Sequence, residues 1–185
     1  MNDRALARSS PGEPSPAEVV AALNGKLIWG PPRRAVDMQI FDLGERVPIV
    51  NRGGRNYMIG EYRLHIQSDW RFVRTGVAFV TYEDIRLPTT DAPDAPFDPD
   101  LGSRTLRDEL LERFISNSSD RERTVEQATV TKAGGLLLHF RGGATLEVDP
   151  EDAKSDREAW RLLRPDGSHA VMLGSRFEIA WPPPN

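Results

Sequence analysis

The stretch YRLHIQSDWRFVRTGVAFVTY, residues 62–82, carries the clearest structural signal in this chain. Apolar and polar residues alternate from Tyr57 to Gln67, which is the pattern of a strand with one buried face. Residues 70–74 and 77–82 form two shorter strands separated by Thr75-Gly76, and this arrangement is typical of a β-hairpin. Because the three strands follow one another without an intervening helix, the stretch predicts an antiparallel sheet.

Most of the remaining sequence contains short strands of the same kind. Pro48 places one of them at the edge of a sheet, because proline cannot donate a backbone hydrogen bond. Pro31-Pro32 predicts a break in regular structure for the same reason. The further strands are predicted at residues 36–40, 46–50, 125–131, 136–140, 145–148, 160–163, 170–173 and 177–181.

Two helices interrupt these strands. Residues 15–18 (Ser-Pro-Ala-Glu) form a capping box and predict a short N-terminal helix. Residues 105–117 predict a longer amphipathic helix, with leucines on one face and charged residues such as Arg107 and Glu109 on the opposite face. The sequence therefore predicts an α+β fold, mainly antiparallel sheet in two similar halves, with the amphipathic helix between them and the short helix at the N-terminus.

An internal similarity suggests the two halves. Trp70-Arg71-Phe72-Val73-Arg74 matches Trp160-Arg161-Leu162-Leu163-Arg164, and each segment is followed by a glycine-containing turn and another strand. A histidine between two apolar residues precedes each segment, but at different distances. Either a small β-unit is duplicated, or Trp-Arg pairs recur by chance in an arginine-rich chain. We expect a disordered tail at residues 1–13 and one domain at 14–185, with halves at about 19–86 and 103–182 joined by the acidic, proline-rich loop 87–102.

Two motifs connect the sequence to other proteins. One comprises Glu158-Ala159-Trp160-Arg161-Leu162, Pro165-Asp166-Gly167, Gly174 and Ala180-Trp181, and the other is the segment Tyr62 to Arg71. Together they resemble small bacterial domains of unknown function, which are commonest in actinobacteria. The resemblance implies no established activity and assigns no catalytic residue. Some of the similar domains resemble immunity or accessory proteins of toxin systems.

Composition excludes several classes of protein. The chain has 185 residues, no cysteine and a net charge of −4. The absence of cysteine excludes a disulfide scaffold, a thiolate zinc site and a cysteine nucleophile. No apolar run approaches the roughly 20 residues of a membrane-spanning helix, and the first residues lead into no signal-peptide core. We therefore expect a cytoplasmic protein that does not enter a membrane.

No metal, cofactor or catalytic site is predicted. The three histidines, with Glu61 or Asp69, could bind a metal only if the sheets brought them together, and none has the spacing of a known metal motif. Four aspartates of the connecting loop are interrupted by prolines and lack the order of an EF-hand. No serine lies in a nucleophile elbow. The histidines are His65, His139 and His169, and the aspartates are Asp91, Asp94, Asp98 and Asp100.

Two groups of residues are candidates for binding a ligand. A pocket between the halves would hold a small molecule or an anion through Arg63, His65, Arg71 and His139. Arg52-Gly53-Gly54-Arg55 could hold an anion with two guanidiniums and a flexible backbone, or it could simply be a hairpin turn.

Charge is segregated along the chain. Residues 46–74 contain six arginines and two acidic residues, whereas residues 83–100 contain six acidic residues and one arginine. The simplest interpretation is that the acidic loop folds over the basic strands and neutralises them. A surface of mixed charge could also guide a protein partner. Aromatic residues among the arginines allow a third hypothesis, a surface for single-stranded nucleic acid.

These observations favour a non-enzymatic, cytoplasmic protein-binding domain, either immunity-like or an accessory factor, whose partner the sequence does not name. The first alternative is a domain that binds a small molecule or an anion between the halves and that could be enzymatic. The second is binding of single-stranded nucleic acid, which the net negative charge disfavours.

Overall fold

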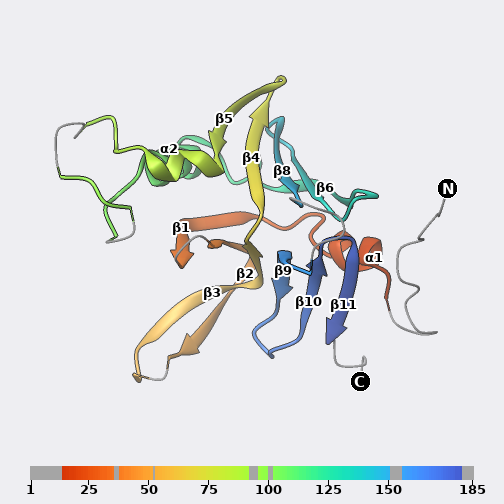
Figure 1. Ribbon diagram of the computed structural model, residues 1–185. Coiled ribbons are helices and arrows are strands. Elements are labelled where there is room, and N and C mark those ends of the chain that lie inside the picture. Colours follow the sequence, from red (N-terminus) through yellow and green to blue (C-terminus); the bar gives the residue numbers. More distant parts are fainter. Residues whose placement is uncertain are drawn as a thin grey trace.

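Two antiparallel sheets, two α-helices and one 3-10 helix are found in the structure, a computed structural model that describes residues 14–35, 38–51, 53–91, 96–99, 102–150 and 156–180 (Figure 1). The six-stranded sheet has the order β1 (Ile28–Ala35), β2 (Met38–Val50), β3 (Asn56–Ile66), β9 (Glu158–Leu163), β10 (His169–Leu173) and β11 (Arg176–Ala180). The five-stranded sheet has the order β5 (Val77–Thr81), β4 (Asp69–Arg74), β8 (Ala144–Asp149), β7 (Leu136–Phe140) and β6 (Val125–Val130). The helices are α1 (Pro16–Ala21), α2 (Leu106–Asn117) and the 3-10 helix η1 (Tyr82–Arg86).

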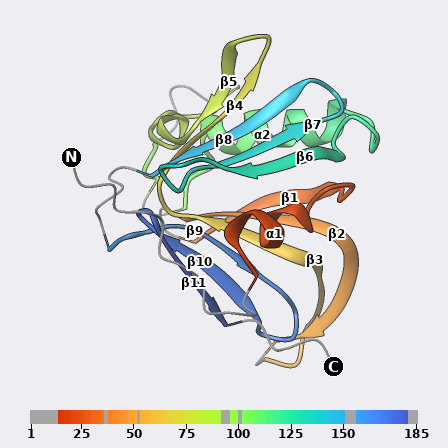
Figure 2. The same cartoon turned by 90° about the vertical axis from the view of Figure 1, so that its right-hand side faces the viewer.

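The chain crosses between the two sheets twice, as Figure 2 shows. β3 continues into β4 through Gln67 and Ser68, and β8 is followed by β9. The two crossings are neighbours, because β3 pairs with β9 in one sheet and β4 pairs with β8 in the other. In the first half, the meander β1–β3 belongs to the six-stranded sheet, and β4 and β5 belong to the five-stranded sheet. In the second half, the meander β6–β8 belongs to the five-stranded sheet, and β9–β11 belong to the six-stranded sheet. The predicted antiparallel sheet is confirmed, and the fold is richer in strands than a balanced α+β protein.

The similar segments of the two halves lie on corresponding strands. Trp70 is near the start of β4 and Trp160 is near the start of β9, directly after each crossing. His65 lies on β3, the third strand of its half, whereas His139 lies on β7, the second strand of the other half. The histidines are thus not part of the repeated pattern.

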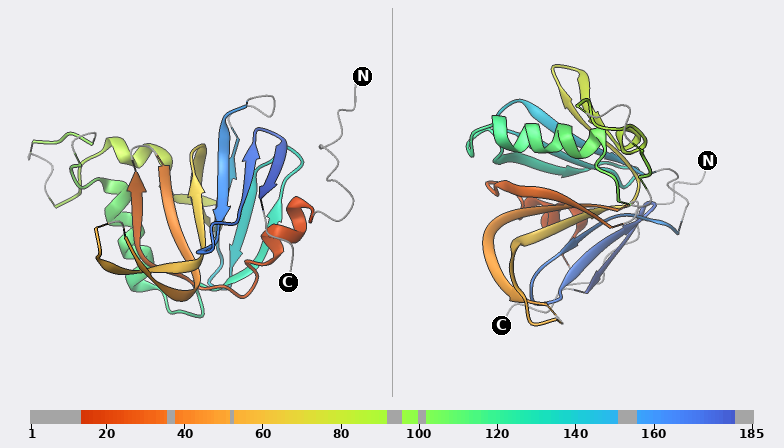
Figure 3. Two further views of the ribbon diagram at one scale, coloured as in Figure 1. Left: turned by 90° about the horizontal axis from the view of Figure 1, so that it is seen from below. Right: turned by 90° about the vertical axis from the view of Figure 1, so that its left-hand side faces the viewer.

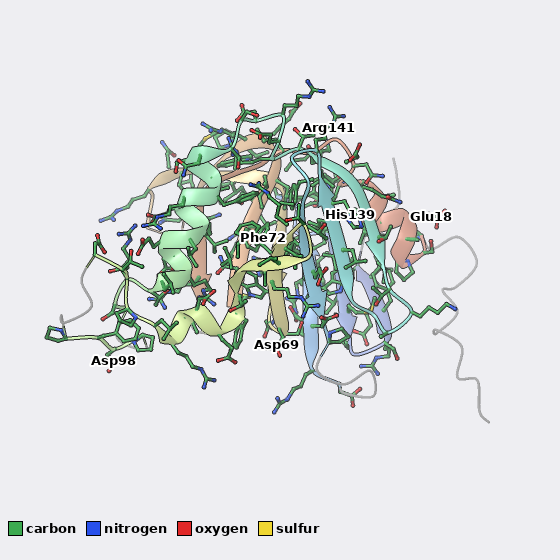
Figure 4. All side chains as sticks on the ribbon, turned by 90° about the horizontal axis from the view of Figure 1, so that it is seen from above. Glu18, Asp69, Phe72, Asp98, His139 and Arg141 are labelled. Atoms are coloured by element: carbon green, nitrogen blue, oxygen red, sulfur yellow. The ribbon has the colours of Figure 1, made fainter. Side chains whose placement is uncertain are left out.

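The core lies between the sheets and is built around Phe72, at the centre of the molecule in Figure 4. Phe72 has no exposed surface, and its ring centroid is 4.9 Å from that of Phe114 on α2 and 5.9 Å from that of Phe140 on β7. Trp160 is also fully buried, and its indole N–H donates to the carbonyl oxygen of Gly134 at 2.9 Å. Large side chains from both halves therefore form one core.

The predicted helices are present with their caps, but one face of α2 differs from the prediction. Arg107 and Glu109 are buried, although the amphipathic pattern assigned them to solvent. The Arg107 guanidinium lies 5.9 Å from the ring centroid of Trp70, and the Glu109 carboxylate accepts hydrogen bonds from the Thr90 amide and hydroxyl. The prediction was wrong here because α2 packs against β1, β5 and η1, so its contact surface is wider than its apolar stripe (Figure 3).

The prolines of the first half were only partly interpreted correctly. Pro31 and Pro32 lie within β1 instead of in a break, because β1 is an outer strand with a shift in register between Trp29 and Arg33. The strand predicted at 46–50 is the end of β2, which extends beyond β1. Pro48 faces Met58 of β3 there. Residues 1–13, the predicted tail, lie outside the described residues. No described helix is long and apolar enough to cross a membrane.

Candidate functional site

The outer face of the six-stranded sheet, the face turned away from the other sheet, carries charged side chains. Leu64 and Ile66 of β3 belong to the core, so the alternate residues Arg63 and His65 lie on the outer face. Strand register then places Arg33, Ile40, His65, Arg161 and Val171 directly opposite one another on β1, β2, β3, β9 and β10. We name five neighbouring polar residues of this face the arginine cluster: Arg33, Asp42, Arg63, His65 and Arg161.

A buried carboxylate lies within the arginine cluster. The Asp42 side chain is 7% exposed and forms ion pairs with Arg33 and with Arg63, whose Nε lies 3.7 Å from Oδ1. The amide of Gly60 donates to the same Oδ1 at 2.8 Å. Residue 60 must be glycine for this approach, because a Cβ atom there would lie 2.6 Å from the backbone nitrogen of Leu43. Asp42 therefore joins β1, β2 and β3 through charge-assisted hydrogen bonds.

His65 is a neutral imidazole beside three guanidiniums. Burial, together with the positive charges of Arg63, Arg161 and Arg33, lowers the pKa of His65 to about 4. Its Nε2 is buried and has no hydrogen-bond partner among the described residues. The Nε atoms of Arg63 and Arg161 are also buried and without a hydrogen-bond partner among the described residues. Arg161 also forms an ion pair with Glu158 on its own strand.

Apolar residues of the same face surround the arginine cluster. Ile40, Ile59 and Val171 are 7%, 3% and 6% exposed, although they do not belong to the core between the sheets. Half-buried guanidiniums among apolar neighbours are shielded from water, which strengthens their attraction for an anion. The arrangement suits a carboxylate or phosphate group, for which arginine provides donors of matching geometry.

The structure separates the four residues from which a pocket between the halves was predicted. Arg63 and His65 belong to the arginine cluster, but Arg71 and His139 alternate with core residues of β4 and β7 and lie on the outer face of the five-stranded sheet. Arg71 forms ion pairs with Glu147 and Asp149 at 2.7 and 3.8 Å, and His139 Nδ1 lies 3.0 Å from the Thr145 hydroxyl. The four side chains share no pocket, because the chain changes sheets between β3 and β4 and the core fills the space between the sheets.

The predicted anion site at the β2–β3 turn has little free hydrogen-bonding capacity. Arg52 lies outside the described residues, and Arg55 is exposed. The Asn51 side chain accepts from the amides of Gly53 and Arg55, both at 2.9 Å. These amides stabilise a hairpin turn, which was the other interpretation of this segment.

The acidic loop does not neutralise the basic strands in the described structure. The Thr89 hydroxyl lowers the pKa of Asp91, with smaller contributions from Arg104 and Arg113. Arg104 and Arg113 themselves form ion pairs with residues of α2. Asp98 lies on the far side of α2 from His139 in Figure 4. Arg63 pairs with Asp42 on one sheet, and Arg71 pairs with Glu147 and Asp149 on the other, so the described part of the loop does not neutralise these two arginines.

Two pockets lie away from the arginine cluster, and the suggested metal sites are not assembled by the described residues. One pocket, of about 270 Å³, lies between α2 and Asp91, and another, of about 160 Å³, lies between Asp69, Tyr82 and Asp149. Within the described residues, no three histidine or acidic side chains are grouped so that they could hold a metal ion. Asp94 and Asp100 of the suggested calcium site lie outside the described residues.

The sequence did not identify three members of the arginine cluster. Arg33 follows the Pro31-Pro32 pair, which was interpreted as a break, and Asp42 carries no local signal. Arg161 was noticed only as part of the repeated Trp-Arg segment. A signal for the whole site would have required the pairing of β3 with β9, whose residues are far apart in the sequence.

His65 makes stability depend on pH. In the unfolded chain its pKa is about 6.5, so between about pH 6.5 and 4 the unfolded state binds a proton that the folded state does not. We expect the free energy of unfolding to fall by about 1–2 kcal/mol over this range, a value reduced for the part of the imidazole that water reaches. Urea unfolding at pH 7 and 4.5 measures the change.

The free energy of unfolding of the variant His65→Gln should fall less than that of the wild type between these two pH values. His139→Gln, a half-buried histidine on the other sheet, is the matched control for the substitution itself. An equal loss in the wild type and in His65→Gln would show that other groups cause the pH dependence.

Comparison with known proteins gives a family but no function. Residues 60–175, more than half of the chain, match the model of a family of unknown function, DUF6188. The matched segment contains both crossings between the sheets, together with β3, β9 and most of the arginine cluster. No curated protein and no protein of solved structure matches the chain. The expectation of an uncharacterised family is confirmed, and the chain belongs to DUF6188.

Proposed function

We propose that the chain is a non-enzymatic binding domain that holds an anionic group at the arginine cluster. The observation that carries the proposal is the meeting of Arg33, Arg63 and Arg161, together with His65, on one face of the sheet. The side chains of Arg33, Arg63 and Arg161 are 34%, 22% and 37% exposed, so an anion on the outer face can reach them. Guanidiniums bind carboxylate and phosphate groups through charge-assisted hydrogen bonds.

Substitution of Arg161 tests this proposal. Arg161→Gln should weaken binding of small anions by about tenfold or more, because a hydrogen bond to a charged group contributes roughly 1.5–3 kcal/mol. Titration with acetate, citrate and sulfate, followed by NMR, measures the affinity. Arg176→Gln is the matched control, since Arg176 lies on β11 of the same sheet, outside the cluster. Equal affinities of the two variants would contradict the proposal.

A second candidate function is binding of another protein, as an immunity-like or accessory factor. The supporting observation is the exposed apolar surface of the β2–β3 hairpin, where Val50, Tyr57 and Met58 are 65%, 36% and 44% exposed. A partner that binds the wild type but not Tyr57→Ser/Met58→Ser would support this function. Val77→Ser is the control, because Val77 is equally exposed on the β4–β5 hairpin. We also propose that the protein is cytoplasmic. We further propose that the two halves share an origin, which their common strand order supports.

A surface for single-stranded nucleic acid has less support. Arg63 and Arg71 point outward from different sheets, so the arginines of residues 46–74 form no continuous basic groove. Such a groove is what a protein needs to follow a nucleic-acid backbone.

A further inference from the structure

We propose that the group bound at the arginine cluster is a dianionic phosphoryl group, and that His65 takes up a proton when this group binds. The inference rests on the proposed anion-binding function and names the ligand class of the same site. Three features of the cluster carry it: the directions of its donors, its balance of charge and the place of His65 among the guanidiniums.

The donors of the cluster come from separate strands. Arg33, Arg63 and Arg161 lie on β1, β3 and β9, so they approach the outer face from different positions. A planar carboxylate is satisfied by the two parallel hydrogen bonds of one guanidinium. A tetrahedral phosphoryl group presents oxygen atoms in several directions, and can therefore accept from several guanidiniums at once. The arrangement favours a phosphoryl group over a carboxylate.

The balance of charge favours protonation of His65 when a dianion binds. The three guanidiniums face Asp42 within the cluster and Glu158 beside it, so the cluster and Glu158 together have a net charge of +1 while His65 is neutral. A dianion changes this to −1. Protonation of His65 brings the charge back to zero, whereas a monoanion balances the cluster without any proton.

His65 is placed to respond to the bound group. It lies directly opposite Arg161, and Arg63 precedes it by two residues on the same face of β3. Among the described residues, the other charged or titratable groups on this face include one arginine and one carboxylate near the cluster, Arg33 of β1 and Asp42 of β2. Farther along the sheet they include Glu61 of β3, Glu158 of β9, His169 of β10, and Arg176 and Glu178 of β11. An anion that contacts two guanidiniums of the cluster therefore lies beside the imidazole. Its negative charge opposes the three positive charges that keep His65 neutral in the free protein.

Calorimetry with sulfate tests the inference directly. Sulfate is a tetrahedral dianion that does not titrate near neutral pH, so any proton taken up on binding comes to the protein. We expect proton uptake to be small at pH 7.5 and to grow as the pH falls toward about 5, obtained at each pH from binding heats in two buffers with different ionisation enthalpies. The affinity for sulfate should rise as the pH falls toward about 5, because the bound state holds the extra proton.

Two variants and one competing ligand sharpen the test. His65→Gln should bind sulfate about tenfold more weakly at pH 6 and without proton uptake, because it loses one charge-assisted hydrogen bond. His169→Gln should keep the proton uptake of the wild type, since His169 lies on the same face but outside the cluster. Acetate should bind more weakly than sulfate.

The source of the phosphoryl group is distinguished by two probes, adenosine monophosphate and a phosphoserine peptide. Tighter binding of either probe than of sulfate supports the inference and assigns the group to a small molecule or to a protein. Sulfate binding without proton uptake, or acetate binding as tight as sulfate binding, would overturn this inference and leave the proposed function standing. Binding of no anion would overturn both.

Discussion

Phe72→Ala is expected to lower the free energy of unfolding by about 3–5 kcal/mol, the range observed for loss of a fully buried aromatic side chain. Phe72 has no exposed surface and contacts aromatic rings from β2, β4, β5, β7 and α2. The cavity left behind would lie between both sheets and the helix, where no single element can move to fill it. Denaturant unfolding followed by circular dichroism measures the effect.

Phe177→Ala is the control for this prediction, because Phe177 is only partly buried on the outer strand β11. We expect its cost to be clearly smaller than that of Phe72→Ala. Equal costs would mean that the aromatic cluster is not the centre of the core.

Asp42→Asn is expected to destabilise the protein by about 3–5 kcal/mol, because it leaves two partly buried guanidiniums without their charged partner. The amide also replaces one of the two oxygens that Arg33, Arg63 and the Gly60 amide now share. The same variant should bind anions more tightly than the wild type, since Asp42 competes with a ligand for these guanidiniums. Sulfate should therefore restore part of the lost stability, by mass action.

Thermal unfolding with and without sulfate measures both effects. Asp149→Asn is the matched control, because the Asp149 side chain is 62% exposed and its ion pair with Arg71 contributes little. A stability of Asp42→Asn that does not respond to sulfate would contradict the role given to the arginine cluster.

Local patterns in the sequence predicted most of the secondary structure. The alternation from Tyr57 to Gln67 predicted β3, and the residues around Thr75-Gly76 predicted the β4–β5 hairpin. These signals work because a strand with one buried face needs apolar residues at every second position. The strand β1 was missed, because Pro31 and Pro32 are tolerated in an outer strand that has a shifted register.

The candidate site depends on information that is not local. Gln67-Ser68 carries no turn signal, so the change of sheet between β3 and β4 was not visible in the sequence. That change puts Arg71 on a different face from Arg63, and the pairing of β3 with β9 brings Arg161 beside His65 instead. The burial of Arg107 was missed for a similar reason, because the space against Trp70 is created by tertiary packing.

The double crossing of the chain has a consequence for synthesis on the ribosome. β3 and β4 emerge first, but the strands that pair with them, β9 and β8, lie in the second half of the chain. At about 5–20 residues per second, the edges of β3 and β4 remain unpaired for on the order of ten seconds. Unpaired strand edges promote association with other chains. The nascent first half therefore exposes one unpaired edge of β3 and one of β4, and neither half alone contains all the strands of either sheet.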